Sequence, residues 1–422
     1  MPRKRLLIAA TRFPYPAVGG DRVRVFHLCR LLARHFEVEL LTLGDPDASD
    51  IEGFRSETGV NTVKVVRHSR LRAVSGALRS LVGNEPLQVG YYRNRRFQAE
   101  FRRASARADV VLCHLIRSAP LWGDETRTPA ALDMCDVISN RFEQMASQGA
   151  WWHPWTWISA MEGRRTREFE RSQARRFGLV TMVTDTDARM LSMSNDQLLT
   201  ITQGVDLARY PYVAPSLRMG HHLAFVGRMD TAPNVEAVRW FVRHILPSLP
   251  EQVRLKVIGI CPRPLAEELA SNERVTVTGQ VPSIAQACLD CFAGVAPVHV
   301  ATGIQNKVLE YFALGLPAII TPSVGRGLSP QLQHCSVQAS NAHEWVTAVR
   351  RLWSDRYSHT GPAISARRFV EVHHNWAVIG NTLGSRLLAM AGDHTLPTWK
   401  GALEHKLGGV VSNDSPLPVV GQ

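Results

Sequence analysis

Residues 302–310 combine residue types that can bind an anionic ligand. Gly303 permits close approach of the backbone, and a helix that starts just after it leaves the N–H groups of residues 304–306 without intrahelical partners. Unpaired N–H groups at a helix start attract anions, and Lys307 adds positive charge at the same place. We therefore expect a nucleotide to bind at this turn.

Glu310 follows Lys307 by three positions, which places both side chains on one face of a helix. The ammonium group can then meet a diphosphate while the carboxylate accepts hydrogen bonds from ribose hydroxyls. The alternative is a structural ion pair at a solvated helix start. We favour the ligand, because the segment runs into a buried strand expected at 318–321.

Arg228 follows Gly227 at the end of another expected strand, where its guanidinium can make two hydrogen bonds to a phosphate opposite Lys307. The alternative is a surface pair with Asp230 or Glu236. Asn234 can instead simply cap the helix that follows.

Gly19 and Gly20 come between the first expected strand and a helix that starts near Asp21. Their amides can meet a diphosphate or a sugar, with Arg22 and Arg24 flanking the site. An ordinary connection between a strand and a helix would have the same sequence.

Three further polar residues follow buried strands of the first half. His114 can steady a sugar, although a lone histidine at the end of an apolar run is more often a core residue. Asp133 and Asp136 are candidates to position or deprotonate an acceptor hydroxyl, with helix capping at Asp136 as the alternative.

Apolar runs alternate with amphipathic stretches in both halves of the 422-residue chain, which predicts two parallel sheets covered by helices. The proline-containing segment 210–216 is the expected hinge, with a cleft beside it. The expected strands are 6–10, 38–42, 63–66, 110–114, 130–132 and 179–183, then 223–226, 255–259, 275–277, 294–297 and 318–321, with a helix at 235–245.

Four segments together resemble retaining glycosyltransferases of the family 4, group 1 type, in particular a bacterial subgroup associated with exopolysaccharide. These are FPYPAVGGDRVR at 13–24, TQGVD at 202–206, FVGRMD at 225–230 followed by PN, and TGIQNKVLE at 302–310. The resemblance covers most of the chain.

The resemblance implies an α/β protein of GT-B architecture, in which two Rossmann-like domains face each other across a cleft. It implies an acceptor domain at 1–210, a nucleotide-sugar domain at 217–375, and a helix at 376–391 that crosses back to the first domain. Lys307, Arg228 and His114 would be catalytic. The donor would be bound by Gly227, Thr302, Gly303, Ile304, Gln305, Asn306, Val308, Glu310, Gly19 and Gly20.

The implied reaction moves a sugar from a UDP-sugar or GDP-sugar to a hydroxyl acceptor with retention of configuration, and it needs no cofactor and no metal. A glycan or a lipid-linked glycan of a bacterial surface polysaccharide is the expected acceptor. The commoner family pattern has a second glutamate eight positions before Glu310, where this chain has Thr302. Either backbone amides hold the sugar or catalysis is lost; we favour the first. A nucleotide-sugar epimerase and a non-catalytic nucleotide-sugar-binding partner remain alternatives.

The net charge of +12 is concentrated at residues 67–107, which hold ten arginines and two acidic residues. No nucleic-acid motif accompanies this charge, so an anionic membrane surface is the expected partner, unless the arginines reflect genome composition. Four tryptophans within 151–157 either face that membrane or form a buried aromatic knot.

The remaining features point to a cytoplasmic protein without disulfides. No apolar run is long enough to span a bilayer, and the run at 6–10 is too short for a signal peptide. The seven cysteines are scattered, and Cys288 with Cys291 has no second pair to complete a zinc site, so we expect them in the core. Disorder is expected at 392–422.

Overall fold

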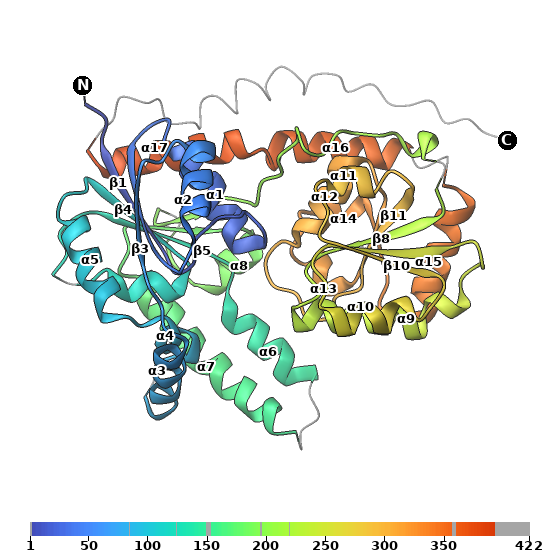
Figure 1. The fold of residues 1–422 in the computed structure, drawn as a ribbon, viewed down its shortest axis with the longest axis horizontal. Helices are drawn as coiled ribbons and strands as arrows, with labels where there is room; N and C mark the ends of the chain where they lie inside the picture. The colour runs from blue at the N-terminus through green and yellow to red at the C-terminus, as the bar shows by residue number, and fades with distance from the viewer. Residues whose placement is uncertain are drawn as a thin grey trace.

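The computed structural model describes residues 2–83, 85–123, 125–148, 153–194, 196–218, 220–356 and 360–392. They form two domains that lie side by side, each a parallel sheet covered by helices (Figure 1). This confirms the expected fold class. The tail from residue 393, where disorder was expected, lies outside the described residues.

The first domain contains a seven-stranded sheet with the order β3-β2-β1-β4-β5-β6-β7. Its strands are β1 Arg5–Ala10, β2 Glu37–Leu43, β3 Thr62–Val66, β4 Val110–His114, β5 Ala130–Cys135, β6 Leu179–Met182 and β7 Leu198–Thr200. Its helices are α1 Gly20–Leu32, α2 Ala48–Thr58, α3 Arg70–Val82, α4 Leu87–Tyr92, α5 Arg95–Ser105, the 3-10 helix η1 Ile116–Leu121, α6 Ile138–Gln148, α7 Pro154–Ala174 and α8 Asp185–Met190.

The second domain contains a six-stranded sheet with the order β10-β9-β8-β11-β12-β13. Its strands are β8 His222–Val226, β9 Arg254–Ile258, β10 Val275–Gly279, β11 Cys291–Ala296, β12 Ala318–Ile320 and β13 Ser336–Gln338. Its helices are η2 Pro215–Leu217, α9 Ala232–His244, η3 Leu246–Ser248, α10 Arg263–Ala270, α11 Ile284–Ala287, α12 Asn306–Leu314, α13 Pro322–Gly325, α14 Pro330–His334, α15 Ala342–Ser354 and α16 Thr360–His373. The last helix of the described chain is α17 Trp376–Met390.

Strand β1 shows why the strands read as continuous apolar runs. Leu6 and Ile8 pack into the core under α1 and α17, while Leu7 and Ala9 pack into the core on the opposite face of the sheet. Because helices cover both faces of a parallel sheet, successive side chains are buried on both sides. Every strand expected from the sequence is present, with ends that differ by a few residues.

Helix α17 returns to the first domain and packs on α1, as the resemblance implied. The contact is close, because a Cβ at Gly380 would lie 2.6 Å from Leu31. The Trp376 ring stacks on His27 at a centroid distance of 4.5 Å. Ile201 packs in the core of the first domain and Val205 in that of the second, so the chain passes between the domains near residues 202–204 and again between α16 and α17. The hinge expected at 210–216 stays a prediction.

Candidate functional site

The loop of residues 301–305, which we call the Thr302 loop, connects β11 to α12 on the side of the second domain that faces the first. Gly303 has φ +57, a left-handed conformation that favours glycine. Helix α12 begins at Asn306, and no side chain of the described residues caps it. The N–H groups of residues 303–306 donate to no described residue, so they can receive an anion as predicted.

Lys307 lies in the first turn of α12 and is 7% exposed. Its Nζ donates a hydrogen bond of 2.7 Å to Asn234 Oδ1 and lies 4.6 Å from the centre of the Phe225 ring. A Cβ at Gly227 would come within 3.4 Å of this nitrogen, so the glycine leaves room beside it. Burial lowers the pKa of Lys307 to about 7, although Glu310 opposes the shift.

Glu310 is half-buried one turn after Lys307. Burial raises its pKa to about 7, against the opposing effects of the Tyr210 hydroxyl and of Lys307. The two side chains therefore influence each other electrostatically, as their spacing predicts. Each can change its protonation state near neutral pH.

Arg228 forms the surface pair that was considered as the alternative. Its Nε and Nη2 lie 3.1 and 2.5 Å from the carboxylate oxygens of Asp230. It also faces the first domain, because a Cβ at Gly19 would lie 3.5 Å from Arg228 Nη1. The guanidinium is thus held by Asp230 at the place where the two domains meet.

Asn234 does not cap α9, and the interpretation that it does is wrong. The residue before the first turn is Thr231. Asn234 instead accepts a hydrogen bond from Lys307, and its Nδ2 donates to the Arg228 carbonyl oxygen at 2.9 Å. Its amide therefore links the Lys307 ammonium group to the backbone of Arg228.

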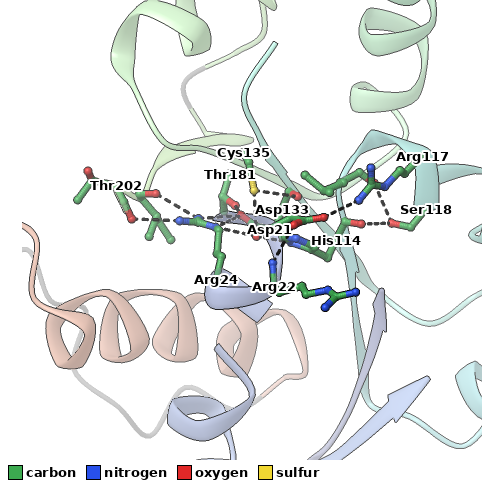
Figure 2. A network of polar contacts seen from close by, with 12 residues as sticks. Asp21, Arg22, Arg24, His114, Arg117, Ser118, Asp133, Cys135, Thr181 and Thr202 are labelled. Atoms are coloured by element: carbon green, nitrogen blue, oxygen red, sulfur yellow. Dashed lines mark hydrogen bonds and ion pairs between the residues drawn. The ribbon is translucent and has the colours of Figure 1, made fainter. Parts of the chain in front are cut away.

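A buried polar network fills the first domain beneath this region, and Figure 2 shows it centred on Asp133. The Asp133 carboxylate accepts hydrogen bonds from Arg24 Nε and Nη2 at 2.8–3.1 Å, from His114 Nδ1 at 2.8 Å and from Thr181 Oγ1 at 2.6 Å. The Arg24 guanidinium and the His114 bond hold the pKa of Asp133 well below its usual range despite burial.

This network corrects two predictions. Asp133 is 0% exposed and Arg24 is 1% exposed, so neither can contact an acceptor as expected. They form a buried ion pair that positions other groups. Arg22 is half-buried, and its backbone N–H donates to Asp21 Oδ1.

His114 is the member of the network with a free ring nitrogen. Asp133 offers only acceptor oxygens, so His114 Nδ1 must carry the proton in their hydrogen bond. His114 Nε2 is buried and has no partner among the described residues. That nitrogen can bind a ligand hydroxyl. Cys135 Sγ also lies near Asp133. The charge of the Asp133 carboxylate is already offset by the Arg24 guanidinium.

Arg117 and Asp21 are not among the site residues predicted from the sequence, yet both lie beside the network (Figure 2). Arg117 donates to Asp21 Oδ2 at 2.9 Å and to Thr11 Oγ1 at 2.6 Å, and its guanidinium lies over the Tyr92 ring. Arg117 also borders a hollow of about 280 Å³ between α4, α5 and η1. This hollow is lined by Val89, Tyr92, Arg93, Asn94, Arg95, Phe97, Gln98, Arg117, Pro120 and Leu121.

The two domains touch through Asp136 and the Thr302 loop. Thr302 Oγ1 donates to Asp136 Oδ2 at 2.8 Å, and a Cβ at Gly303 would lie 3.2 Å from the Asp136 Cβ. Gln144 of α6 adds bonds to the Ala301 carbonyl oxygen and Ser323 Oγ, both at 3.1 Å. Burial raises the pKa of Asp136. Asp136 therefore lies beside the predicted diphosphate site.

Gly19 and Gly20 face the same region from the first domain, because a Cβ at Gly20 would lie 3.8 Å from Asn306 Nδ2. The structure thus brings the glycine turn, Arg228 and the start of α12 together.

Trp155 and Trp157 at the start of α7 are 65% and 67% exposed, so they are not part of a buried knot, while Trp151 and Trp152 lie outside the described residues. Cys288 and Cys291 are buried and free, as expected. Among the described residues, no helix is long and apolar enough to cross a bilayer.

Most of the second domain matches a known family model. Residues 220–355 match the family model of glycosyl transferases group 1, and this segment contains Gly227, Arg228, Lys307 and Glu310. No curated protein matches the chain.

Solved structures align over most of the chain. HepE of Anabaena in complex with UDP is 13% identical with a TM-score of 0.65, and the alignment covers 92% of this chain and 100% of that one. Sucrose-phosphate synthase from Thermosynechococcus elongatus is 16% identical with a TM-score of 0.68 and the same coverage. WaaG, a glycosyltransferase involved in lipopolysaccharide biosynthesis, is 15% identical with a TM-score of 0.61, covering 90% and 99%. These similarities establish the GT-B fold.

Proposed function

We propose that this protein is a retaining glycosyltransferase that moves a sugar from a UDP-sugar or GDP-sugar to a hydroxyl acceptor. One observation carries the proposal: buried Lys307 lies beside an unpaired helix start, within the segment that matches glycosyl transferases group 1. Among the described residues, no carboxylate forms an ion pair with Lys307 and no acceptor bonds the N–H groups next to it, and such a cation suits a diphosphate. The similarity to HepE in complex with UDP supports a nucleotide donor.

The charge of the departing diphosphate would be neutralised by this chain's own groups. Lys307, Arg228 and the N–H groups of the Thr302 loop would all contact the diphosphate from the second domain. Arg228 lies where that domain meets Gly19 of the first. Such preorganised donors stabilise charge that develops in a transition state. These groups can carry out the charge neutralisation without a divalent cation. Glu310 would hold the ribose hydroxyls.

His114 would act on the sugar. Its Nε2 has no partner among the described residues, and Asp133 fixes the ring orientation (Figure 2). A hydroxyl of the sugar can donate to this nitrogen. Arg24 and Asp133 would act through His114 as positioning residues.

The acceptor would bind on the first domain, in the hollow next to Arg117. Arginines at 93, 95 and 117 around an apolar floor that includes Phe97 and Leu121 suit an acceptor with an anionic and an apolar part. A lipid-linked glycan has both. We therefore propose that the protein acts at the cytoplasmic face of a membrane, in synthesis of a surface polysaccharide.

The decisive experiment is a titration of the purified protein with UDP, GDP, ADP and their common sugar conjugates, followed by the thermal midpoint. A ligand that binds only the folded state must raise it. We expect one nucleotide and its sugar conjugate to do so, and Lys307→Ala to abolish the effect while Lys64→Ala, a lysine on the far strand β3, retains it. No response to any nucleotide would contradict the proposal.

Product analysis then separates the remaining alternatives. A transferase releases nucleoside diphosphate only when an acceptor is present. An epimerase would change the free donor without an acceptor, and a non-catalytic partner would bind the donor and turn nothing over. The non-catalytic alternative is suggested by Thr302, which supplies no negative charge where the family pattern has glutamate.

A further inference from the structure

Helix α3 packs on its neighbour through its small residues. A Cβ at Gly76 would lie 2.3 Å from the Gly90 carbonyl oxygen of α4, and a Cβ at Gly90 would meet Ser80 Oγ. Ala73, on the same side of α3 as Ser80, is buried. The face of α3 that is turned toward the protein therefore contains no large apolar side chain among these contacts.

Three large apolar residues of α3 face the solvent instead. Leu71, Val74 and Leu78 are 85%, 52% and 58% exposed. Their spacing of three and four residues places them on one stripe of the helix. Ordinary amphipathic helices bury such a stripe, so an exposed one marks a surface that binds a partner.

The charge around this stripe identifies the kind of partner. Arg70 and Arg79 are exposed and form no ion pair with a described residue, and α3 contains no acidic residue. The segment 67–107 carries ten arginines against two acidic residues. A second copy of this chain would bring the same positive charge to the contact, so self-association on this face is disfavoured.

The position of α3 suits a membrane. Figure 1 shows α3, α6 and α7 projecting from the first domain on the side opposite α16 and α17. Arg165 of α7 donates to the Ser80 carbonyl oxygen, and Glu162 of α7 accepts from the Leu87 N–H of α4, so these helices form one unit. Trp155 and Trp157 are exposed on α7 of the same unit.

We infer that the exposed stripe of α3 docks on an anionic lipid bilayer. Leu71, Val74 and Leu78 enter the boundary between headgroups and acyl chains, while Arg70 and Arg79 meet the phosphates. Helix α4, on which α3 packs, also lines the hollow beside Arg117. The inference deepens the proposed function, because it states how a lipid-linked acceptor reaches that hollow, but the docking surface does not depend on the sugar-transfer chemistry.

The test is co-sedimentation of the full chain with vesicles of phosphatidylcholine, with and without phosphatidylglycerol. We expect binding only to the anionic vesicles. The triple variant Leu71→Ser, Val74→Ser, Leu78→Ser should lower binding roughly tenfold or more. Changing Arg70 and Arg79 to Gln should lower it by roughly fivefold per residue at low salt.

A matched control exists in the second domain, where Leu217, Leu289 and Val372 are also exposed. Changing these three to Ser should leave vesicle binding unchanged. Absence of wild-type binding to anionic vesicles, equal loss in both triple variants, or a wild-type dimer that the α3 variant converts to monomer would each overturn the inference. The thermal response to nucleotide, measured on the same samples, shows whether the proposed function survives independently.

Discussion

Thr302 Oγ1 donates a hydrogen bond of 2.8 Å to Asp136 Oδ2, which joins a loop of the second domain to the end of strand β5 in the first. Gly303 makes this contact possible, because a side chain there would press against the Asp136 Cβ. The bond also opposes the rise in the pKa of Asp136 that burial causes. The hydroxyl therefore helps to keep a carboxylate charged between the domains.

Thr302→Val should weaken closure of the two domains. A buried carboxylate that loses a donor costs about 1.5–3 kcal/mol, so kcat/KM should fall roughly 10- to 100-fold. Nucleotide affinity should change little, because Lys307 and the start of α12 are intact. Small-angle scattering with bound nucleotide should show a larger radius of gyration.

Thr302→Ser is the matched control, because it keeps the hydroxyl. It should retain wild-type closure and activity. Equal behaviour of the Val and Ser variants would show that the hydrogen bond to Asp136 does not contribute to closure.

His114→Ala should lower kcat more than it changes donor affinity. Loss of the Nε2 contact to the sugar is expected to cost about 1–3 kcal/mol in the transition state, or roughly 10- to 100-fold in kcat. The substitution also removes one hydrogen bond to Asp133, so Thr181→Val serves as the control because it removes another such bond at 2.6 Å. If both variants lose activity equally, His114 has only a structural role.

Nucleotide binding should be coupled to proton uptake by Lys307. The pKa of Lys307 is lowered to about 7, so at pH 8 most of the free protein carries the neutral amine. A diphosphate favours the charged form and raises that pKa. Binding at pH 8 should therefore take up roughly one proton, and affinity should fall by up to about tenfold per pH unit above 7.

Calorimetry in two buffers with different ionisation enthalpies measures this proton uptake. Lys307→Met should abolish the uptake and weaken binding at every pH. Glu310→Gln is the informative control, because the pKa of Glu310 is also about 7. Proton uptake that persists in Lys307→Met and disappears in Glu310→Gln would show that Glu310, and not Lys307, takes up the proton.

The sequence predicts the sheets well because both of their faces are buried, so each strand is a short apolar run such as β4. It misses β7 and β13, because these short edge strands are only partly buried and form no apolar run, whereas the equally short β12 is fully buried. It locates the Thr302 loop because glycine, a helix start and Lys307 are adjacent in the chain.

The sequence does not predict contacts that depend on tertiary packing. Arg24 and Asp133 are 109 positions apart, and only the placement of α1 next to β5 joins them. Likewise, the periodicity of α3 is the same whether Leu71 and Leu78 face a core or the solvent. Only the structure shows which polar residues are buried. Burial decides whether such a residue contacts a ligand or positions another side chain.

Arg24→Ala should destabilise the first domain strongly. It leaves Asp133 charged at 0% exposure, and removing one partner of a buried pair costs about 3–5 kcal/mol. Arg228→Ala breaks a pair with Asp230 that is more than a third exposed on the arginine side, so it should cost at most about 1 kcal/mol. Urea unfolding of both variants gives the comparison, and equal costs would contradict a dominant buried pair.

The buried pair of Arg24 and Asp133 predicts that the stability of the protein falls as the pH falls. The folded pKa of Asp133 lies well below that of the unfolded chain, so the unfolded state binds more protons as the pH falls. The stability from the pair is fully present above the usual carboxylate range and is lost progressively below it. Asp133→Asn should lower stability at pH 7 and flatten its decline between about pH 5 and 3, measured by urea unfolding. A decline as steep as in the wild type would mean that other carboxylates cause the acid sensitivity.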